Sequence, residues 1–105
     1  MADGKPSHYE RIRADYPAVI AAVEQLGTAI GSTGPLDART THLVQIAAAA
    51  AIHSEGAVHS HVRRALAAGA TEAQIRHALI ALISTIGFPT VTAALSWVDD
   101  VLDNR

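Results

Sequence analysis

The segment "ALIALISTIGFPTVTAALSWV", residues 78–98, runs for 21 residues without a charged side chain. That length is enough for a helix to cross a lipid bilayer. However, Gly87-Phe88-Pro89 interrupts the segment in its middle, and proline ends one helix while suiting the first turn of the next. Serine and threonine residues are also scattered through both halves. The pattern therefore predicts two short buried helices that meet at a turn, not a membrane span.

The first half of the chain shows helical periodicity. Apolar residues recur at three- and four-residue steps between residues 9 and 26, with Pro17 placed to kink or split the helix. A glycine-rich loop, "GTAIGSTGP" at residues 27–35, follows it. Asp37 is a good N-cap for a second helix, which we expect to run to about His53. Its "LVQIAAAAAI" stretch is apolar nearly all round, so most sides of this helix should be buried.

In the second half of the chain, residues that favour helix ends predict three further helices. Ser54 is placed to cap a third helix that ends before Gly69. Thr71 and Gln74 form a capping box for a fourth helix, expected to reach about Ile86, and Pro89 opens a fifth. No segment alternates with a period of two, so no sheet is expected. The sequence predicts an all-α, single-domain bundle of about five helices, with an N-terminal helix and glycine-rich loop at residues 1–35 and a core at residues 36–105.

Composition narrows the classes of partner. Half of the 105 residues are apolar, which is high for so small a domain, and we expect the excess to be buried between subunits of a homo-oligomer. The net charge of −2 is not the positive charge expected of a protein that binds nucleic acid or an anionic membrane. The absence of cysteine excludes disulfides, thiolate metal sites and thiol redox chemistry. No apolar signal segment is visible at the start, so a cytoplasmic location is the default expectation.

The densest cluster of chemically active residues is "HSEGAVHSH" at residues 53–61. His59 lies four residues from both Glu55 and Arg63, a charged stripe that should face water. His61 lies on another face, in line with small residues, so its ring should find a buried partner or face a pocket. His42 and His53 share a helical face but lie about 16 Å apart along the axis, too far to bind one metal.

The order of these residues resembles a known superfamily. "LDARTTHLVQIAAAAA", "GAVHSHVRRALAAGATEAQIRHALI" and "GFPTVTAAL" are similar to the carboxymuconolactone decarboxylase and alkylhydroperoxidase D superfamily, from about Leu36 to Leu102. The resemblance implies an alkylhydroperoxidase D-like all-α bundle that assembles into homo-oligomers such as trimers or hexamers. It implies no metal or organic cofactor.

The resemblance also identifies this chain as a cysteine-less member. The peroxidase branch carries a Cys-x-x-Cys pair, a histidine four residues later and an upstream glutamate; these positions fall on Ser54, Ala57, His61 and His42. Only the histidine is retained. Because the peroxidase cycle needs a thiolate that forms a disulfide, we do not expect thiol peroxidase activity.

The lactone decarboxylase branch is closer, since it lacks the cysteine pair and keeps the histidine. The implied substrate is a small carboxylated unsaturated lactone. His61 is then the candidate acid–base residue, because imidazole exchanges protons near neutral pH, and His42 is its candidate partner. Candidate binding residues are Ser54 and the cations Arg39 and Arg64, with Arg63 as a further cation able to hold a carboxylate.

Three functions remain open from sequence. The first is a decarboxylase-like lyase or proton-transfer enzyme that binds a small organic acid near His61. The second is a non-enzymatic ligand-binding or structural oligomer, because three of the four active-site positions of the peroxidase branch have changed. The third is a metal-binding protein that uses His42 and His61, with Glu55 or another subunit completing the site.

Overall fold

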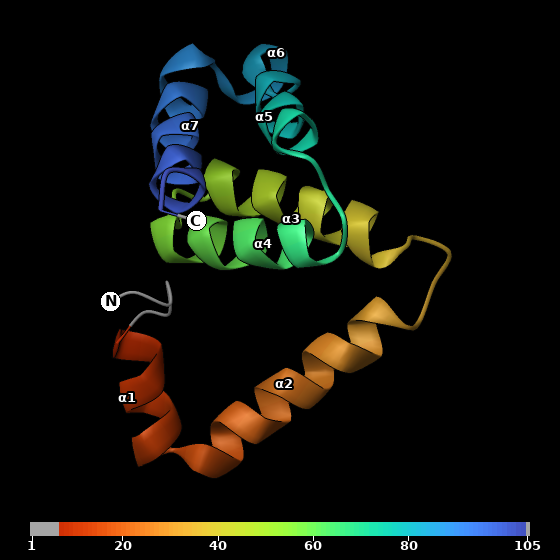
Figure 1. Ribbon diagram of the computed structural model, residues 1–105, viewed down its shortest axis with the longest axis vertical. Helices are drawn as coiled ribbons and strands as arrows, with labels where there is room; N and C mark the ends of the chain where they lie inside the picture. The colour runs from red at the N-terminus through yellow and green to blue at the C-terminus, as the bar shows by residue number, and fades with distance from the viewer. Residues whose placement is uncertain (1–6, 105) are drawn as a thin grey trace. The chain divides into compact units, whose positions relative to one another are not determined.

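The computed structural model describes residues 7–104, and every secondary-structure element in that range is an α-helix (Figure 1). This confirms the all-α prediction. The helices are α1 (Ser7–Asp15), α2 (Pro17–Gly31), α3 (Ala38–Ala51), α4 (Glu55–Ala67), α5 (Glu72–Ile80), α6 (Ile83–Ile86) and α7 (Phe88–Leu102).

Two of the five expected helices are divided. The first is split at Tyr16, where α1 ends and Pro17 begins α2. Proline has no N–H to continue the hydrogen-bond ladder, so the split follows directly from its chemistry. The fourth is split at Ala81–Leu82 into α5 and the single turn α6. The second helix ends at Ala51, two residues earlier than expected, so His53 lies beyond it.

The chain forms two compact units, with the boundary between Leu36 and Asp37. In the first unit, α1 and α2 are joined by Glu24, whose carboxylate accepts hydrogen bonds from the Tyr9 hydroxyl at 2.7 Å and from Arg13 at 2.6 Å. Arg13 also lies over the Tyr9 ring, 5.1 Å from its centroid. Ile20 is the buried hydrophobic residue of α2.

The second unit contains a core in which α3 packs on α4, and α5 and α7 pack on both. Small side chains let these helices approach closely. The expectation that most sides of α3 are buried is wrong. Ala49 and Ala50 lie in the core, but Val44 is 54% exposed and Ala48 and Ala51 are also exposed, because only one face of the helix packs on its neighbours. The buried residues of this core are Ile46, Ala49, Ala50, Val58, Val62, Ala65, Ala70, Ile75, Leu79, Val91, Ala94, Val98 and Leu102.

The helix ends agree with the predicted caps at two of three positions. The Asp37 side chain accepts a hydrogen bond from the Thr40 N–H at 2.7 Å. Thr71 and Gln74 form the reciprocal capping box. Ser54 occupies the N-cap position of α4, but its side chain makes no capping hydrogen bond. Within residues 7–104, none of the helices combines the length and the hydropathy that crossing a bilayer requires.

Candidate functional site

The hairpin of α3 and α4 brings His42 and His61 together. The two helices run antiparallel side by side (Figure 1), joined by the three residues Ile52–Ser54. In this turn His53 adopts a left-handed conformation with φ of 60°, which is uncommon for a residue other than glycine. His42 precedes the turn by about three helical turns and His61 follows it by about two. Because the path is antiparallel, both side chains lie well away from the turn and their rings meet across the hairpin.

The two imidazoles face each other through the same atom. Nδ1 of His42 lies 3.3 Å from Nδ1 of His61. The ring centroids are 5.5 Å apart and the ring planes are inclined by 36°. Both side chains are partly buried. The structure thus places His61 against a polar partner and not in bulk solvent.

This contact restricts which nitrogen of each ring can carry a proton. A neutral imidazole carries one N–H and one lone pair. For the Nδ1 atoms to form a hydrogen bond, one ring must carry its proton on Nδ1 and the other must carry it on Nε2. The pair then presents two unlike groups outside the contact: an Nε2 lone pair on one ring and an Nε2–H on the other.

The surroundings keep both rings neutral near pH 7. Burial lowers the pKa of His42 and of His61, and the nearby Arg64 guanidinium lowers both further. The charge of a protonated His42 also lowers the pKa of His61. The polar side chain of Gln45 acts the other way and raises the pKa of His42. The desolvated rings thus resist protonation, which suits a proton-accepting base.

Gln45 contributes a buried polar group on the same helix as His42. It follows His42 by three residues in α3, and its Oε1 atom is buried without meeting the geometry of a hydrogen bond to any described residue. Sequence reasoning missed this residue. The signal available was the i, i+3 spacing from His42, which places both side chains on neighbouring positions of one helical face.

The two candidate arginines differ in their partners. Arg64 is exposed, lies one turn after His61 and makes no hydrogen bond or ion pair to a described residue. Arg39 lies one turn before His42, and its Nη2 atom is 3.9 Å from Asp37 Oδ2, a long contact between exposed groups. Arg64 is therefore the cation that acts electrostatically on both histidines, and it has no carboxylate partner among the described residues.

Ser54 lies at the N-cap of α4, apart from the pair. It precedes His61 by two helical turns, about 10 Å along the axis. Its backbone N–H donates to the Ala49 carbonyl at 2.9 Å and closes the α3–α4 turn. In this structure Ser54 thus has a role in the hairpin connection.

A second cluster brings together groups that could hold a metal ion. The ligand atoms of Glu55, His59 and Asp100 all lie within 4.8 Å of one another. His59 Nε2 is 3.1 Å from Asp100 Oδ2 and 3.8 Å from Glu55 Oε2. His59 faces water only in part, because α7 packs on α4 and brings Asp100 next to it, which leaves the His59 side chain 24% exposed. The sequence had suggested Glu55 as a metal ligand beside His42 and His61. In the structure Glu55 lies with His59 and Asp100.

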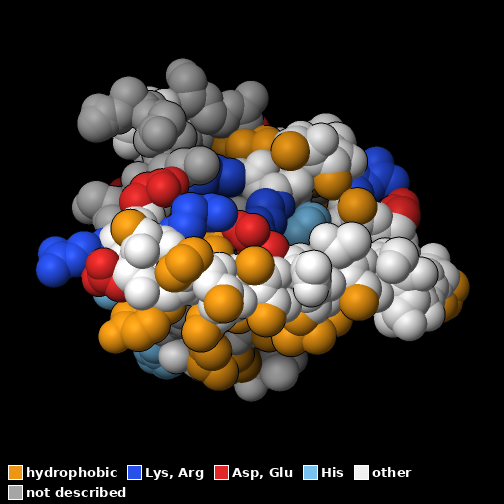
Figure 2. Space-filling model, turned by 90° about the horizontal axis from the view of Figure 1, so that it is seen from below, with side chains coloured by type: hydrophobic (Ala, Val, Ile, Leu, Met, Phe, Trp, Pro, Cys, Tyr) orange, Lys and Arg blue, Asp and Glu red, His pale blue; other side chains and the backbone are white. Residues whose placement is uncertain are grey.

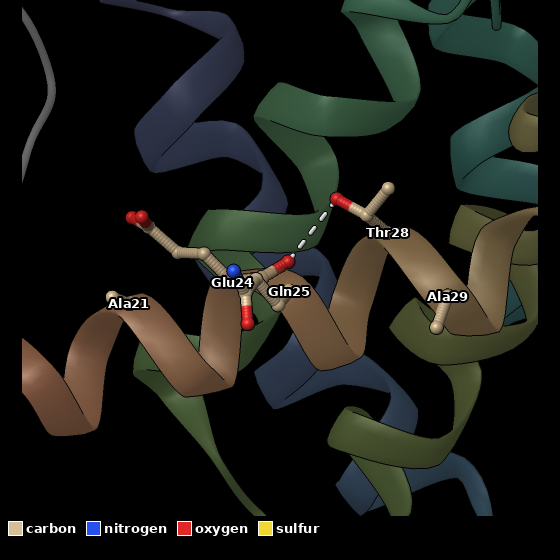
Figure 3. A pocket seen from close by; sticks show the side chains of 5 residues that line it. All are labelled: Ala21, Glu24, Gln25, Thr28 and Ala29. Carbon is tan, nitrogen blue, oxygen red and sulfur yellow. Dashed lines mark hydrogen bonds between the residues drawn. The ribbon is translucent and has the colours of Figure 1, made fainter.

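A shallow open hollow lies on α2 (Figure 3). It is lined by Ala21, Glu24, Gln25, Thr28 and Ala29. The Thr28 hydroxyl inside it donates to the Glu24 backbone carbonyl at 3.2 Å, and the Glu24 carboxylate is already bound by Tyr9 and Arg13. Neither histidine of the pair lines this hollow, so it adds nothing to the site.

Comparison with known proteins agrees with the fold. The model of the carboxymuconolactone decarboxylase family matches residues 17–100. An apo crystal structure of a carboxymuconolactone decarboxylase family protein from Legionella pneumophila superposes with a TM-score of 0.77 at 21% sequence identity, covering 92% of this chain and 87% of that one. A comparison with curated proteins gives no match.

Proposed function

This chain belongs to the carboxymuconolactone decarboxylase family, and on that premise we propose that His42 and His61 form an acid–base pair acting on a small organic carboxylic acid of the unsaturated lactone type. The observation that carries the proposal is the 3.3 Å contact between two partly buried imidazoles. No thiol takes part, because the chain contains no cysteine.

The chemistry needs a proton donor more than a nucleophile. When a carboxylate is lost beside an unsaturated lactone, the C–C bond breaks, carbon dioxide leaves and the electron pair moves into the conjugated lactone. The resulting dienolate carbon then takes a proton from an Nε2–H of the pair. The ring that gives up this proton regains one from water, so that both rings are neutral again after each turnover.

Substrate binding is assigned to Arg64. A guanidinium that pairs with no carboxylate among residues 7–104 is ready to accept one from a substrate through two parallel N–H···O bonds. Its position one turn after His61 places that charge beside the pair. Arg39, at the start of α3, is the second candidate for a further carboxylate of the substrate.

The test uses full-length protein without a histidine tag and a set of carboxylated unsaturated lactones, with release of carbon dioxide as the readout. His61→Ala should lower turnover about 100-fold or more. Arg64→Ala should raise KM, and His77→Ala, on the exposed face of α5, should leave both constants unchanged. Equal turnover by the wild type and His61→Ala would remove the pair from the mechanism. A member that binds carboxylates without catalysis would show Arg64-dependent binding and no turnover.

Homo-oligomerisation, as a trimer or hexamer, belongs to the same proposal. Supporting it is a row of apolar side chains along one face of α2: Val19, Val23, Leu26 and Ile30, which are 46–59% exposed. Figure 2 shows apolar side chains gathered on the surface seen in that view. Apolar rows of this kind on soluble proteins usually mark contact surfaces.

The 3.3 Å distance also supports one alternative, a zinc ion between the two histidines. Two nitrogens that bind tetrahedral zinc at about 2.0–2.1 Å are about 3.3–3.4 Å apart. Gln45 Oε1 is a buried acceptor close enough to His42 to raise its pKa, and it could be a third ligand. Stoichiometric zinc in tag-free protein, lost in His42→Ala and retained in His59→Ala, would favour this alternative. Zinc lost only in His59→Ala would instead indicate the Glu55–His59–Asp100 cluster.

A further inference from the structure

The orientation of the two rings determines where their remaining nitrogens lie. In imidazole, Nδ1 and Nε2 are separated by one carbon and their lone pairs or hydrogens point away from each other. When the Nδ1 atoms of His42 and His61 face each other at 3.3 Å, the two Nε2 atoms point outward from the contact. The pair is therefore a continuous path from one Nε2, through the Nδ1 contact, to the other Nε2.

We infer that His42 and His61 act as a one-proton relay that removes a proton from one atom of the bound acid and returns a proton to another. This inference rests on the proposed function and narrows its reaction class to proton relocation within an unsaturated carboxylic acid. Decarboxylation then ends with the same delivery step.

The relay balances without any further reactant. The ring that carries Nδ1–H accepts a substrate proton on its Nε2 lone pair. Its Nδ1–H passes to the Nδ1 lone pair of the partner ring. The partner gives its Nε2–H to the second substrate atom. Both rings are neutral again with their tautomers exchanged, and one N–H bond has formed on each ring for each one broken.

The neighbouring groups favour a relay over a fixed ion pair. Among the described residues, no carboxylate contacts either ring, so nothing holds a permanent imidazolium in place. The cation Arg64 opposes a positive charge on both rings, and Gln45 favours the proton on His42. A fixed His–carboxylate pair, such as His59 with Asp100, would instead hold one proton on one nitrogen.

The test is nitrogen NMR on metal-free, full-length protein labelled with ¹⁵N-histidine, above the pH at which either ring of the pair is protonated. The relay requires one ring in the Nδ1–H form and the other in the Nε2–H form, with a scalar coupling between the two Nδ1 atoms across the hydrogen bond. If the tautomers exchange rapidly, both rings show nitrogen shifts midway between the two forms. Either result supports the relay.

The relay is overturned if both rings are in the Nε2–H form, because two lone pairs would then face each other and no proton could pass. His61→Gln should abolish the coupling and leave His42 in a single tautomer. His77→Gln, on α5, should leave the coupling unchanged. The coupling requires no bound acid, so failure of carboxylate binding and failure of the relay are separate results.

A kinetic measurement applies to any lactone acid that the wild type turns over. Because the relay needs both rings, His42→Gln, His61→Gln and the double variant should be slowed by similar factors, each about 100-fold. A His42→Gln variant with wild-type turnover would show that His61 acts alone and would overturn the relay.

Discussion

Nδ1 of His42 and Nδ1 of His61 lie 3.3 Å apart, although 19 residues separate them in the chain. The contact exists because α3 and α4 form an antiparallel hairpin whose buried faces pack on each other. Because the two histidines share one hydrogen bond and are both partly buried, protonation of either one should lower the free energy of unfolding. Their response is measurable without a substrate.

Stability should fall as the pH decreases below about 6.5, the ordinary pKa of histidine. The folded protein lowers the pKa of His42 and His61, so the unfolded chain takes up protons that the folded chain resists. Stabilisation from this source is fully present above pH 6.5 and is lost as the pH falls through the folded pKa values. A difference of one between folded and unfolded pKa is worth about 1.4 kcal/mol.

Urea unfolding at pH 7.5 and 5.5 measures this loss, and the loss should be smaller in His61→Gln. At pH 5.5 Asp37 stays charged, because the hydrogen bonds from Thr40 hold its pKa below its ordinary value. His77→Gln is the matched control and should keep the wild-type difference. An equal loss in the wild type and His61→Gln would show that the pair does not couple folding to pH.

The core of the second unit should be sensitive to cavities. Leu79 is fully buried, whereas its neighbour Ile80 on α5 is 45% exposed. Leu79→Ala should lower the free energy of unfolding by about 2–5 kcal/mol, because it removes packed methyl groups and leaves a cavity. Ile80→Ala should cost much less. Chemical denaturation of the two variants checks this, and similar losses would contradict the packing described.

The N-caps of α4 and α5 should contribute differently to the free energy of unfolding. Thr71 makes a reciprocal capping box, so Thr71→Ala should lower the free energy of unfolding by about 1 kcal/mol. Ser54 makes no capping hydrogen bond, and Ser54→Ala should therefore cost less. Thermal melts of both variants provide the comparison; a larger shift for Ser54→Ala would be the contrary result.

The backbone at His53 should accept glycine readily. His53 has a φ of 60°, a conformation that costs an L-residue about 1–2 kcal/mol and glycine almost nothing sterically. After the entropy cost of glycine, His53→Gly should be neutral or stabilising by up to about 1 kcal/mol. Gly69 has a φ of 97°, so Gly69→Ala should destabilise. A marked loss in His53→Gly, measured by urea unfolding, would show that the His53 side chain stabilises the turn.

The apolar row of α2 should control assembly. Val23→Lys places a charge in a face that the proposed oligomer buries, and this should shift sedimentation toward smaller species. Gln25→Lys, at an exposed position of the same helix outside the row, is the control. Wild-type protein that sediments as a monomer at all concentrations would refute the oligomer.

Much of this protein could be predicted from local sequence. Pro17 begins α2 and Pro89 lies in the first turn of α7, while Asp37 and Thr71 cap α3 and α5. These features depend only on the chemistry of a few adjacent residues. The motifs from Leu36 onward also indicated the family. The break at Ala81–Leu82 carries no glycine or proline and had no local signal.

Tertiary structure alone decided which side chains meet. Helical periodicity gave the face of His61 but not the neighbour opposite it, and the pairing with His42 depends on the register of two packed helices. In the same way, Asp100 reaches His59 only because α7 packs on α4. Turns and caps are determined by forces within one helical turn, whereas contacts across 19 or 41 residues are set by how buried surfaces fit together.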